Sequence, residues 1–417
     1  MNQYETNAIK QKFIQEKYEI VDFEEKADIY IVNTCTVTNM SDRKSRQILR
    51  HAKQINKESI LVVIGCYAQV AKEELEKLEE IDLILGNNEK KDIINYINQL
   101  IEENKKIQIT DVMHQKEYLE FENPTCVDKT RAVVKIQDGC DRFCTYCIIP
   151  YARGRVRSRK IENIVEEITD IAKQGIQEIV ITGIHIGSYG KDLKEKISLI
   201  DVLKEINKID GIKRVRLGSL EPKTITQKFL SELIKLEKIC HHFHLSLQSG
   251  CDDTLERMNR KYSTKEFKEA VELIREKYSD VLLTADVIVG FPGETEKEFE
   301  TTYRFLEDIK FYKIHVFKYS KRKGTKASVM PDQILPEKQN ERSNKLIELS
   351  NKVQEEYNKK YIGKQVKVLI EEKEGKYYKG HTSNYMMIYV ESQENLENKI
   401  IDVKITKIEK NKTIAEI

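Results

Sequence analysis

Three cysteines lie within one short stretch of the chain, Asp138-Gly139-Cys140-Asp141-Arg142-Phe143-Cys144-Thr145-Tyr146-Cys147. Their spacing is C-x3-C-x2-C. Three thiolates on one loop can bind three irons of a cubane iron–sulfur cluster and leave the fourth iron open to a substrate or cofactor. A closed cluster or a closed zinc site normally has four ligands, and a ferredoxin-type run has C-x2-C-x2-C spacing. The alternatives are a zinc loop that lacks one ligand and a chance grouping of buried cysteines.

Composition limits the kind of protein. The chain has 417 residues, too many for one ordinary core, so we expect roughly two or three domains. Charged residues make up 34% but the net charge is only +2, so any nucleic-acid surface must be a local patch. The sequence predicts no membrane span and no signal peptide. Clustered thiols without a secreted disulfide framework favour the reducing cytoplasm and a metal.

Residues 1–105 alternate between strand and helix patterns, which predicts a Rossmann-like parallel α/β domain. Apolar runs predict strands, and amphipathic or basic stretches predict helices, the second with Ser41 as its cap. The strands are Ile29–Val32, Ile60–Ile64 and Ile81–Leu85, and the helices are Glu5–Lys17 and Ser41–Lys53. Cys35 and Cys66 each follow a strand directly, so they lie at the carboxyl ends where open α/β sheets bind their ligands.

A second alternating series follows a polar linker, residues 106–130, that contains Pro124 and Cys126. Its candidate strands are Ala132–Ile136, Glu178–Gly183, Arg214–Ser219, His242–Gln248, Leu282–Gly290 and Lys313–Tyr319. Six such units fit an incomplete (β/α)6 barrel over residues 128–355 better than a full eightfold barrel. After a long charged helix, Pro336–Lys360, glycine turns and short apolar strands predict a small β-barrel at residues 358–417.

An open iron at this cysteine spacing resembles the site of radical S-adenosylmethionine (SAM) enzymes. Candidate cofactor residues follow the barrel strands at the carboxyl face, where parallel barrels place their active sites. They are Gly183, Ser219, Gln248, Ile288 and Gly290. The first allows close backbone approach, the next two offer polar groups to a ribose or carboxylate, and the last two can follow an adenine edge. Tyr146 either packs on that adenine or belongs to the core.

A basic stretch follows the cysteine loop. Residues 151–160 contain five positive charges and no negative charge, with arginine at Arg153, Arg155, Arg157 and Arg159. Alternate residues of an extended segment point to one side, and such a stripe suits a phosphate backbone. The alternative is a solvated basic loop. The basic helix at Ser41–Lys53 either extends this patch or presents a solvated face.

Nearly the whole chain resembles the radical SAM methylthiotransferases. The matching segments are Asn33–Thr38, Gly65–Gln69, Gln137–Arg159, Ser246–Arg260, Val287–Thr295 and Val316–Ala327. Asn2–Thr6, Gln137–Phe143 and Tyr151–Arg157 are most similar to the branch acting on N6-threonylcarbamoyladenosine in tRNA. The resemblance implies a transferase of sulfur-containing groups that adds a 2-methylthio group to that nucleoside, beside the anticodon.

The resemblance also implies cofactors and partners. SAM and two 4Fe-4S clusters are expected, one on Cys140, Cys144 and Cys147 and an auxiliary one on Cys35 and Cys66. The C-terminal barrel is expected to be an RNA-binding TRAM domain. The expected partners are the tRNA anticodon loop and an electron donor such as flavodoxin, for a cytoplasmic monomer that does not bind membranes.

One departure from the family concerns its first auxiliary-cluster cysteine, which lies in a Gly-Cys-Lys-Val-Asn-Gln-Tyr-Glu pattern. This chain begins at Met1, where the pattern has Val. We expect the true start to lie upstream, with Met1 in place of a valine. If the chain is this short, two cysteines should hold the auxiliary cluster poorly.

Four alternative functions remain at this stage. The same chemistry could act on an aspartate of a ribosomal protein or on isopentenyladenosine in tRNA. The chain could cleave SAM without inserting sulfur. It could also be a non-catalytic iron–sulfur protein that binds RNA.

Overall fold

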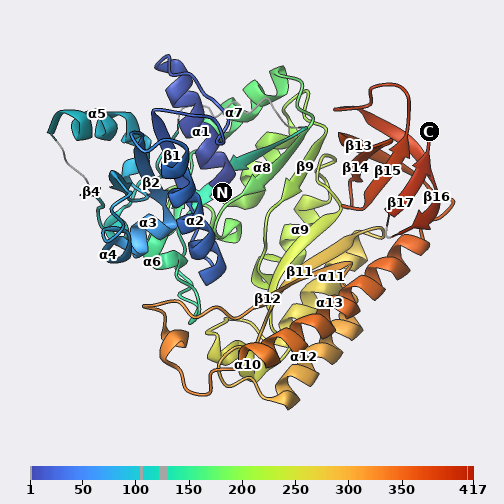
Figure 1. The fold of residues 1–417 in the computed structure, drawn as a ribbon. Helices are drawn as coiled ribbons and strands as arrows, with labels where there is room; N and C mark the ends of the chain where they lie inside the picture. The colour runs from blue at the N-terminus through green and yellow to red at the C-terminus, as the bar shows by residue number, and fades with distance from the viewer. Residues whose placement is uncertain (1, 104–106, 122–129, 411) are drawn as a thin grey trace.

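The computed structural model describes residues 2–103, 107–121, 130–410 and 412–417 (Figure 1). The chain is of the α/β class, with parallel sheets in its first two parts and a closed β-barrel at the C-terminal end. Residues 106 and 122–129 of the predicted linker, with Pro124 and Cys126, and the predicted boundary at residue 128 lie outside the described residues. The domain limits of 1–105, 128–355 and 358–417 therefore stay a prediction.

The N-terminal part is a parallel sheet in the order β1-β2-β3-β4. Its strands are β1 (Ile29–Thr34), β2 (Ile60–Gly65), β3 (Leu83–Leu85) and β4 (Ile107–Gln108). Its helices are α1 (Asn2–Gln15), α2 (Asn39–Ile55), α3 (Cys66–Val70), α4 (Lys72–Leu75) and α5 (Ile93–Glu103). Val62 and Val63 face opposite apolar clusters, because a parallel sheet is buried on both faces and its strands are apolar throughout.

The predicted Ser41 cap is wrong. Helix α2 begins two residues earlier, at Asn39, and Thr38 is its N-cap. The Thr38 hydroxyl accepts the backbone N–H of Ser41 at 3.2 Å. Both residues can cap a helix, and the extended backbone of Thr38 decides between them.

The central part is an incomplete barrel of six parallel strands. They are β5 (Arg131–Lys135), β8 (Glu178–Thr182), β9 (Arg214–Leu217), β10 (His242–Gln248), β11 (Leu282–Val289) and β12 (Lys313–Lys318). They form two three-stranded sheets, joined by parallel bridges from Val215 to Ile239 and from Leu220 to Leu245. All six strands agree with the sequence prediction to within one or two residues at each end.

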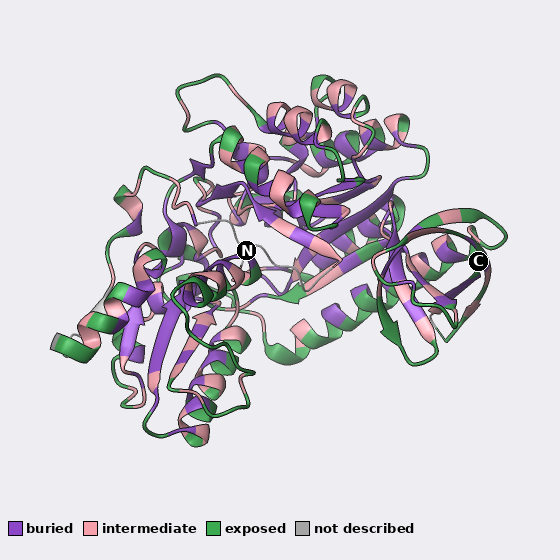
Figure 2. Cartoon of the chain, turned by 90° about the horizontal axis from the view of Figure 1, so that it is seen from above, coloured by how far each residue is buried: buried purple, intermediate pink, exposed green. Residues whose placement is uncertain are grey.

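Helices surround this barrel, and their outer faces are exposed while the strands are largely buried (Figure 2). They are α7 (Ile161–Lys173), α8 (Leu199–Asn207), α9 (Gln227–Leu233), α10 (Asp252–Arg257), α11 (Thr264–Lys277) and α12 (Glu296–Ile309). Short 3-10 turns are η1 (Glu89–Asp92), η2 (Val112–His114), η3 (Ile186–Ser188), η4 (Pro222–Thr224) and η5 (Lys326–Val329). One large apolar cluster, which includes Ile179, Phe243 and Val287, joins strands and helices.

The C-terminal part begins after helix α13 (Pro336–Lys359) and is a closed barrel in the order β13-β14-β15-β17-β16. Its strands are β13 (Gln365–Glu374), β14 (Tyr377–Thr382), β15 (Met387–Glu391), β16 (Ile400–Glu409) and β17 (Lys412–Glu416). The sequence prediction missed β14 and β17, because β14 is largely polar with a central glycine and β17 has a charged residue at each end. Within the described residues, no helix has the length and apolar character needed to cross a membrane.

The N-terminal part contacts both edges of the open barrel. Beside β5, Glu5 of α1 pairs with Lys135 at 3.0 Å. Beyond β12, Arg322 pairs with Asp42 at 2.6 Å. The N-terminal sheet therefore covers the gap between the first and last barrel strands, which brings its carboxyl edge towards that of the barrel.

Candidate functional site

The three-cysteine loop lies between two short elements of the barrel edge, β6 (Gln137–Asp138) and α6 (Ile149–Arg153). Strand β6 pairs with β7 (Arg157–Ser158), so the two ends of the loop are held together. Gly139 has φ +69°, and a Cβ there would lie 1.8 Å from the carbonyl oxygen of Arg155. Only glycine fits this turn.

The thiols of this loop suit a multi-iron cluster better than a single metal ion. Burial raises the pKa of Cys140 to about 11 and that of Cys147 to about 12, so a nearby cation is needed to keep them as thiolates. Thiolates around one zinc would lie roughly 4 Å apart. Among the described residues, the sulfurs of the loop do not all lie within 4.8 Å of one another. The trio that meets this limit, Cys251, Asp253 and Glu298, has its Glu298 carboxylate paired with Arg257 at 2.8 Å.

Cys35 and Cys66 lie at the carboxyl ends of neighbouring parallel strands. Residues Thr34 and Gly65, directly before them, are partners in the β1–β2 ladder, so the two thiols face the same edge. Gly65 has φ +97°, and a Cβ there would lie 2.5 Å from the Thr34 carbonyl oxygen. Burial raises the pKa of Cys35. The seven cysteines in the described residues form no disulfide.

Arg153 joins this pair of cysteines to the barrel. It is the last residue of α6, and its Nε donates to the sulfur of Cys66 at 3.2 Å. Its two terminal nitrogens donate to Glu5 at 2.7 and 3.1 Å, and one also pairs with Asp138. Asn87 lies 3.6 Å from the same sulfur. One guanidinium therefore holds the Cys66 loop beside the three-cysteine loop.

The prediction of an arginine stripe that contacts RNA is wrong for three of its four members. Arg153, Arg157 and Arg159 are 3%, 2% and 1% exposed. Arg159 pairs with Glu120 and Glu167, and Arg157 donates to the Arg153 carbonyl at 2.8 Å. The segment is not one extended strand, because α6 ends at Gly154 and β7 begins at Arg157. Arg155 alone of the four is exposed, and it stacks over Phe143 at 4.7 Å.

Five predicted SAM residues lie at the carboxyl ends of barrel strands, and Tyr146 lies in the cysteine loop. Tyr146 and Ile288 both contact an apolar cluster that includes Met258 and Phe291. The Ser219 hydroxyl lies 2.5 Å from that of Ser246 on the neighbouring strand. These positions agree with a shared ligand but do not test it.

Glycine and glutamine at these strand ends have structural reasons of their own. A Cβ on Gly183 would lie 2.9 Å from the Gln137 side-chain oxygen. The N–H of Gly290 donates to Glu294 at 3.0 Å, and its carbonyl accepts from Gln339, so both backbone polar groups of Gly290 already have partners. Gln248 ends β10 with φ +70°, a strained conformation of the kind found at binding sites.

Sequence reasoning missed one buried carboxylate beside the cysteine loop. Glu221 pairs with Arg142 at 2.6 Å, His185 at 3.0 Å and Arg260 at 3.1 Å. Burial raises its pKa, but hydrogen bonding to His185 and the two arginines lower it to about 2. Arg260 also donates to the Cys144 sulfur at 3.2 Å. The signal was present in the Ser219-Leu220-Glu221-Pro222 segment at a strand end, but its partners are distant in sequence.

Comparison with known proteins agrees with this arrangement. Residues 134–306 match the family described as the radical SAM superfamily, and residues 1–86 match uncharacterized protein family UPF0004. The Bacillus subtilis threonylcarbamoyladenosine tRNA methylthiotransferase MtaB is 41% identical, over 98% of this chain and 92% of its own length. The Clostridium tetani tRNA-2-methylthio-N(6)-dimethylallyladenosine synthase is 35% identical over the same shares. The methyltransferase TsrM from Kitasatospora setae shares the fold, with TM-score 0.59, 15% identity and coverage of 78% of this chain and 74% of its own.

Proposed function

We propose a function from the premise that this chain belongs to the radical SAM methylthiotransferases. It is a transferase that converts N6-threonylcarbamoyladenosine, beside the anticodon of tRNA, to its 2-methylthio derivative. The observation that carries this proposal is the contact of Arg153 with Cys66. Arg153 ends the short helix that follows the three-cysteine loop, so its contact with Cys66 supports a reaction that uses both groups of cysteines.

The residues of the barrel loop fit an open cluster, and those of the N-terminal sheet fit part of a second one. Cys140, Cys144 and Cys147 would hold the barrel 4Fe-4S cluster, and Cys35 and Cys66 would contribute to the auxiliary cluster. When bound, these clusters and SAM supply the radical, the sulfur and the methyl group. The chain binds and orients these groups and excludes water from them.

Particular side chains serve this positioning. Arg260 donates to the Cys144 sulfur while its charge is balanced by Glu221, so the loop keeps its shape around the added charge of a thiolate. Arg153 does the same at Cys66, balanced by Glu5. We assign Tyr146, Gly183, Ser219, Gln248, Ile288 and Gly290 to the walls of the SAM site. At Gly183 and Gly290 the missing side chain is what matters, because neighbouring atoms already fill the space that a Cβ would need.

We propose further features that depend on the tRNA substrate. The residues 358–417 barrel is an RNA-binding TRAM domain, and Arg155 contributes a backbone contact beside the cysteine loop. The enzyme works in the cytoplasm as a monomer, with an electron donor of the flavodoxin type. The support for these assignments is the match of relatives over nearly the whole chain.

The test is mass spectrometry of tRNA nucleosides in a strain that lacks the gene, complemented with this chain. We expect 2-methylthio-N6-threonylcarbamoyladenosine to appear with the wild-type gene and not with a Cys144→Ala variant. A product on isopentenyladenosine or on a ribosomal-protein aspartate, with the threonylcarbamoyl nucleoside unchanged, would contradict the proposed substrate.

A further inference from the structure

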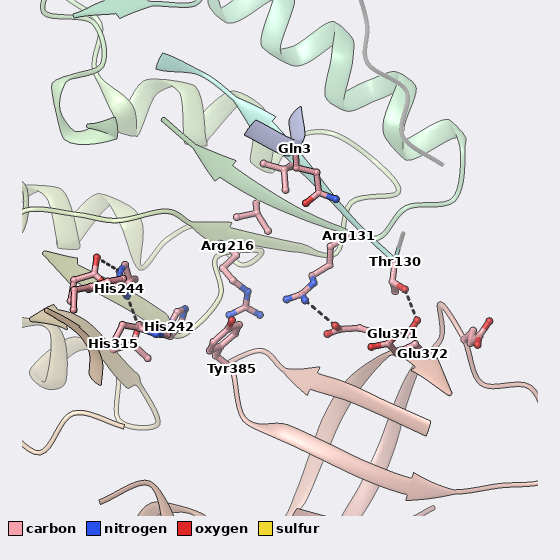
Figure 3. Close-up of a pocket in the computed structure, with 16 residues that line it drawn as sticks. Gln3, Thr130, Arg131, Arg216, His242, His244, His315, Glu371, Glu372 and Tyr385 are labelled. Atoms are coloured by element: carbon pink, nitrogen blue, oxygen red, sulfur yellow. Dashed lines mark hydrogen bonds and ion pairs between the residues drawn. The ribbon is translucent and has the colours of Figure 1, made fainter. Parts of the chain in front are cut away.

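A large polar cavity lies inside the incomplete barrel, towards the C-terminal part (Figure 3). Its volume is about 940 Å³, large enough for a small ligand or a splayed nucleotide. Its lining includes Arg131, Arg216, His242, His244 and His315 from four barrel strands and Tyr385 from the turn after β14. None of these side chains has a part in the cysteine sites described above.

Residues that line the cavity share the inner faces of strands β10 and β11 with residues of the predicted cofactor site. Alternate residues of a strand share a face. His244 and Ser246 of β10 therefore face the same side, with Ser246 nearer to the carboxyl end of the strand, and Ser246 contacts Ser219. On β11, Asp286 is followed in the same way by Ile288. The cavity therefore lies nearer to the amino ends of these strands than the predicted cofactor site does. A substrate base held against the cofactor would place the substituent on its opposite side in this cavity.

A hydrogen-bonded chain organises one wall. Asp286 lies 3.1 Å from Nε2 of His244, whose Nδ1 lies 2.8 Å from the Thr284 hydroxyl. The same hydroxyl lies 3.0 Å from Nε2 of His242. With both rings neutral, one proton arrangement satisfies every bond, and it leaves Nδ1 of His242 as an acceptor. This atom is buried and has no hydrogen-bond partner among the residues that the structure describes.

His315 adds a ring that is free for a ligand. It contacts His244 edge-on, with ring centroids 5.5 Å apart, and makes no hydrogen bond within the described part of the chain. Burial and the neighbouring His244 lower the pKa of His315, so the neutral ring can donate from one nitrogen and accept at the other. Phe317, the next inward residue of β12, is 44% exposed and offers a face on which a base can stack.

Arg131 supplies the cation that can reach a carboxylate. Its side chain is 26% exposed, pairs with Glu371 at 2.8 Å and lies 3.9 Å from Glu178. Arg216 is less available, because Glu178 and two carbonyls of the C-terminal barrel already accept from it. The wall thus offers donors and acceptors together. Its lining holds two arginines and four carboxylates, of which Glu371 pairs with Arg131 and Asp286 pairs with His244.

We propose that this cavity binds the N6 substituent of the target adenosine, a polar group with a carboxylate, and that His315, His244 and Arg131 select it over an apolar substituent. This inference rests on the proposed function. The threonylcarbamoyl group has a carboxylate, a hydroxyl and urea N–H groups to pair with this wall. A dimethylallyl group has none, so it would bury the imidazoles without partners. Such a site rejects the apolar analogue strongly.

The test uses the anaerobically reconstituted full chain and three stem-loop RNAs of one sequence. Their target adenosine carries a threonylcarbamoyl group, a dimethylallyl group or no substituent. The kcat/KM for methylthiolation is measured for each RNA. His315→Leu should lower the preference for threonylcarbamoyl over dimethylallyl RNA at least about tenfold, the effect of one lost hydrogen bond to a buried polar group. Release of 5′-deoxyadenosine in the absence of RNA is measured for each variant, as a check that the cofactor site is intact.

His241→Leu is the matched control. The same substitution is made just outside β10, where the ring pairs with Asp280 on the surface, and the preference should stay as in the wild type. Arg131→Gln provides a second variant, and it should weaken binding of threonylcarbamoyl RNA only, measured by fluorescence anisotropy. An unchanged preference in both cavity variants would overturn the inference while leaving the proposed function intact. A wild-type chain inactive on threonylcarbamoyl RNA would instead overturn the proposed function.

Discussion

Replacing Glu5 by glutamine should destabilise the N-terminal part severely. The carboxylate is fully buried and pairs with Lys90 at 2.6 Å, Lys135 at 3.0 Å and Arg153 at 2.7 Å. It connects helix α1 to the barrel and to the Cys66 loop at once. Removing one partner of a buried pair typically costs about 3–5 kcal/mol, because the remaining charge is left without compensation.

The structure places the expected loss near the lower end of that range, about 3 kcal/mol. Two other side chains still compensate part of the charge. Asp138 pairs with Lys135 at 2.6 Å and with Arg153 at 3.1 Å. Asn87 accepts from Lys90 at 2.8 Å, but an amide oxygen carries no net charge. Lys90 therefore loses its only carboxylate partner among the described residues.

The pH dependence provides a second signature. Burial lowers the pKa of Lys90 to about 8, against the attraction of Glu5. Between this value and about 10.5, the unfolded chain binds a proton that the folded chain does not, so stability rises with pH. Without Glu5 the pKa of Lys90 falls further, and this rise begins at a lower pH. The difference in unfolding free energy between the wild type and the Glu5→Gln variant should therefore be smaller at pH 9 than at pH 7.

Urea unfolding of the cluster-free chain, followed by circular dichroism at both pH values, measures this loss. Hydrogen exchange of α1 localises it. The control is Glu205→Gln, which removes an exposed pair with Lys208 at 2.7 Å and should cost less than about 1 kcal/mol. A Glu5→Gln loss as small as the control, or one that does not change with pH, would refute the reasoning.

Three further predictions concern the cysteine sites and the basic segment. Cys144→Ala should abolish SAM cleavage and lower the iron content, whereas Cys240→Ala, also buried, should leave both unchanged; iron analysis and 5′-deoxyadenosine release decide this. Arg153→Lys removes the guanidinium that donates to one sulfur and two carboxylates. The reduction potential of the auxiliary cluster should therefore shift, and EPR titration measures it. Arg155→Ala should lower the slope of log binding constant against log salt concentration for RNA by about 1. Arg159→Ala should leave this slope unchanged and lower the melting temperature. Equal slopes for the two variants would contradict the structure.

The barrel could be predicted from the sequence because its signals are local. A run such as Leu282–Gly290 is mostly apolar over the length of one strand, apart from Thr284 and Asp286, and the structure has β11 at Leu282–Val289. The positions of Cys35 and Cys66 could be predicted for the same reason, because each directly follows a strand. A residue that directly follows a strand lies at the carboxyl end of the sheet, however the rest of the chain folds.

Side-chain partners could not be predicted in this way. Glu5 and Arg153 are 148 residues apart, and no pattern in either segment indicates that they meet. The same holds for the wall of the cavity, where His244 and Thr284 come from different strands. His242 and His244 both lie within hydrogen-bond distance of the Thr284 hydroxyl. Their shared hydroxyl becomes visible only when β10 and β11 are placed side by side.

The burial of the arginines changes where RNA contacts must be sought. An alternating basic stripe has two physical solutions, a solvated face or a set of buried ion pairs, and the nearby carboxylates decide between them. Glu5, Asp138 and Glu167 neutralise Arg153 and Arg159 in the interior, so neither charge is available to phosphate. Affinity for tRNA must then come mainly from outside this segment. Discrimination inside the barrel cavity and grip on the RNA backbone are therefore separable, and single substitutions can change one without the other.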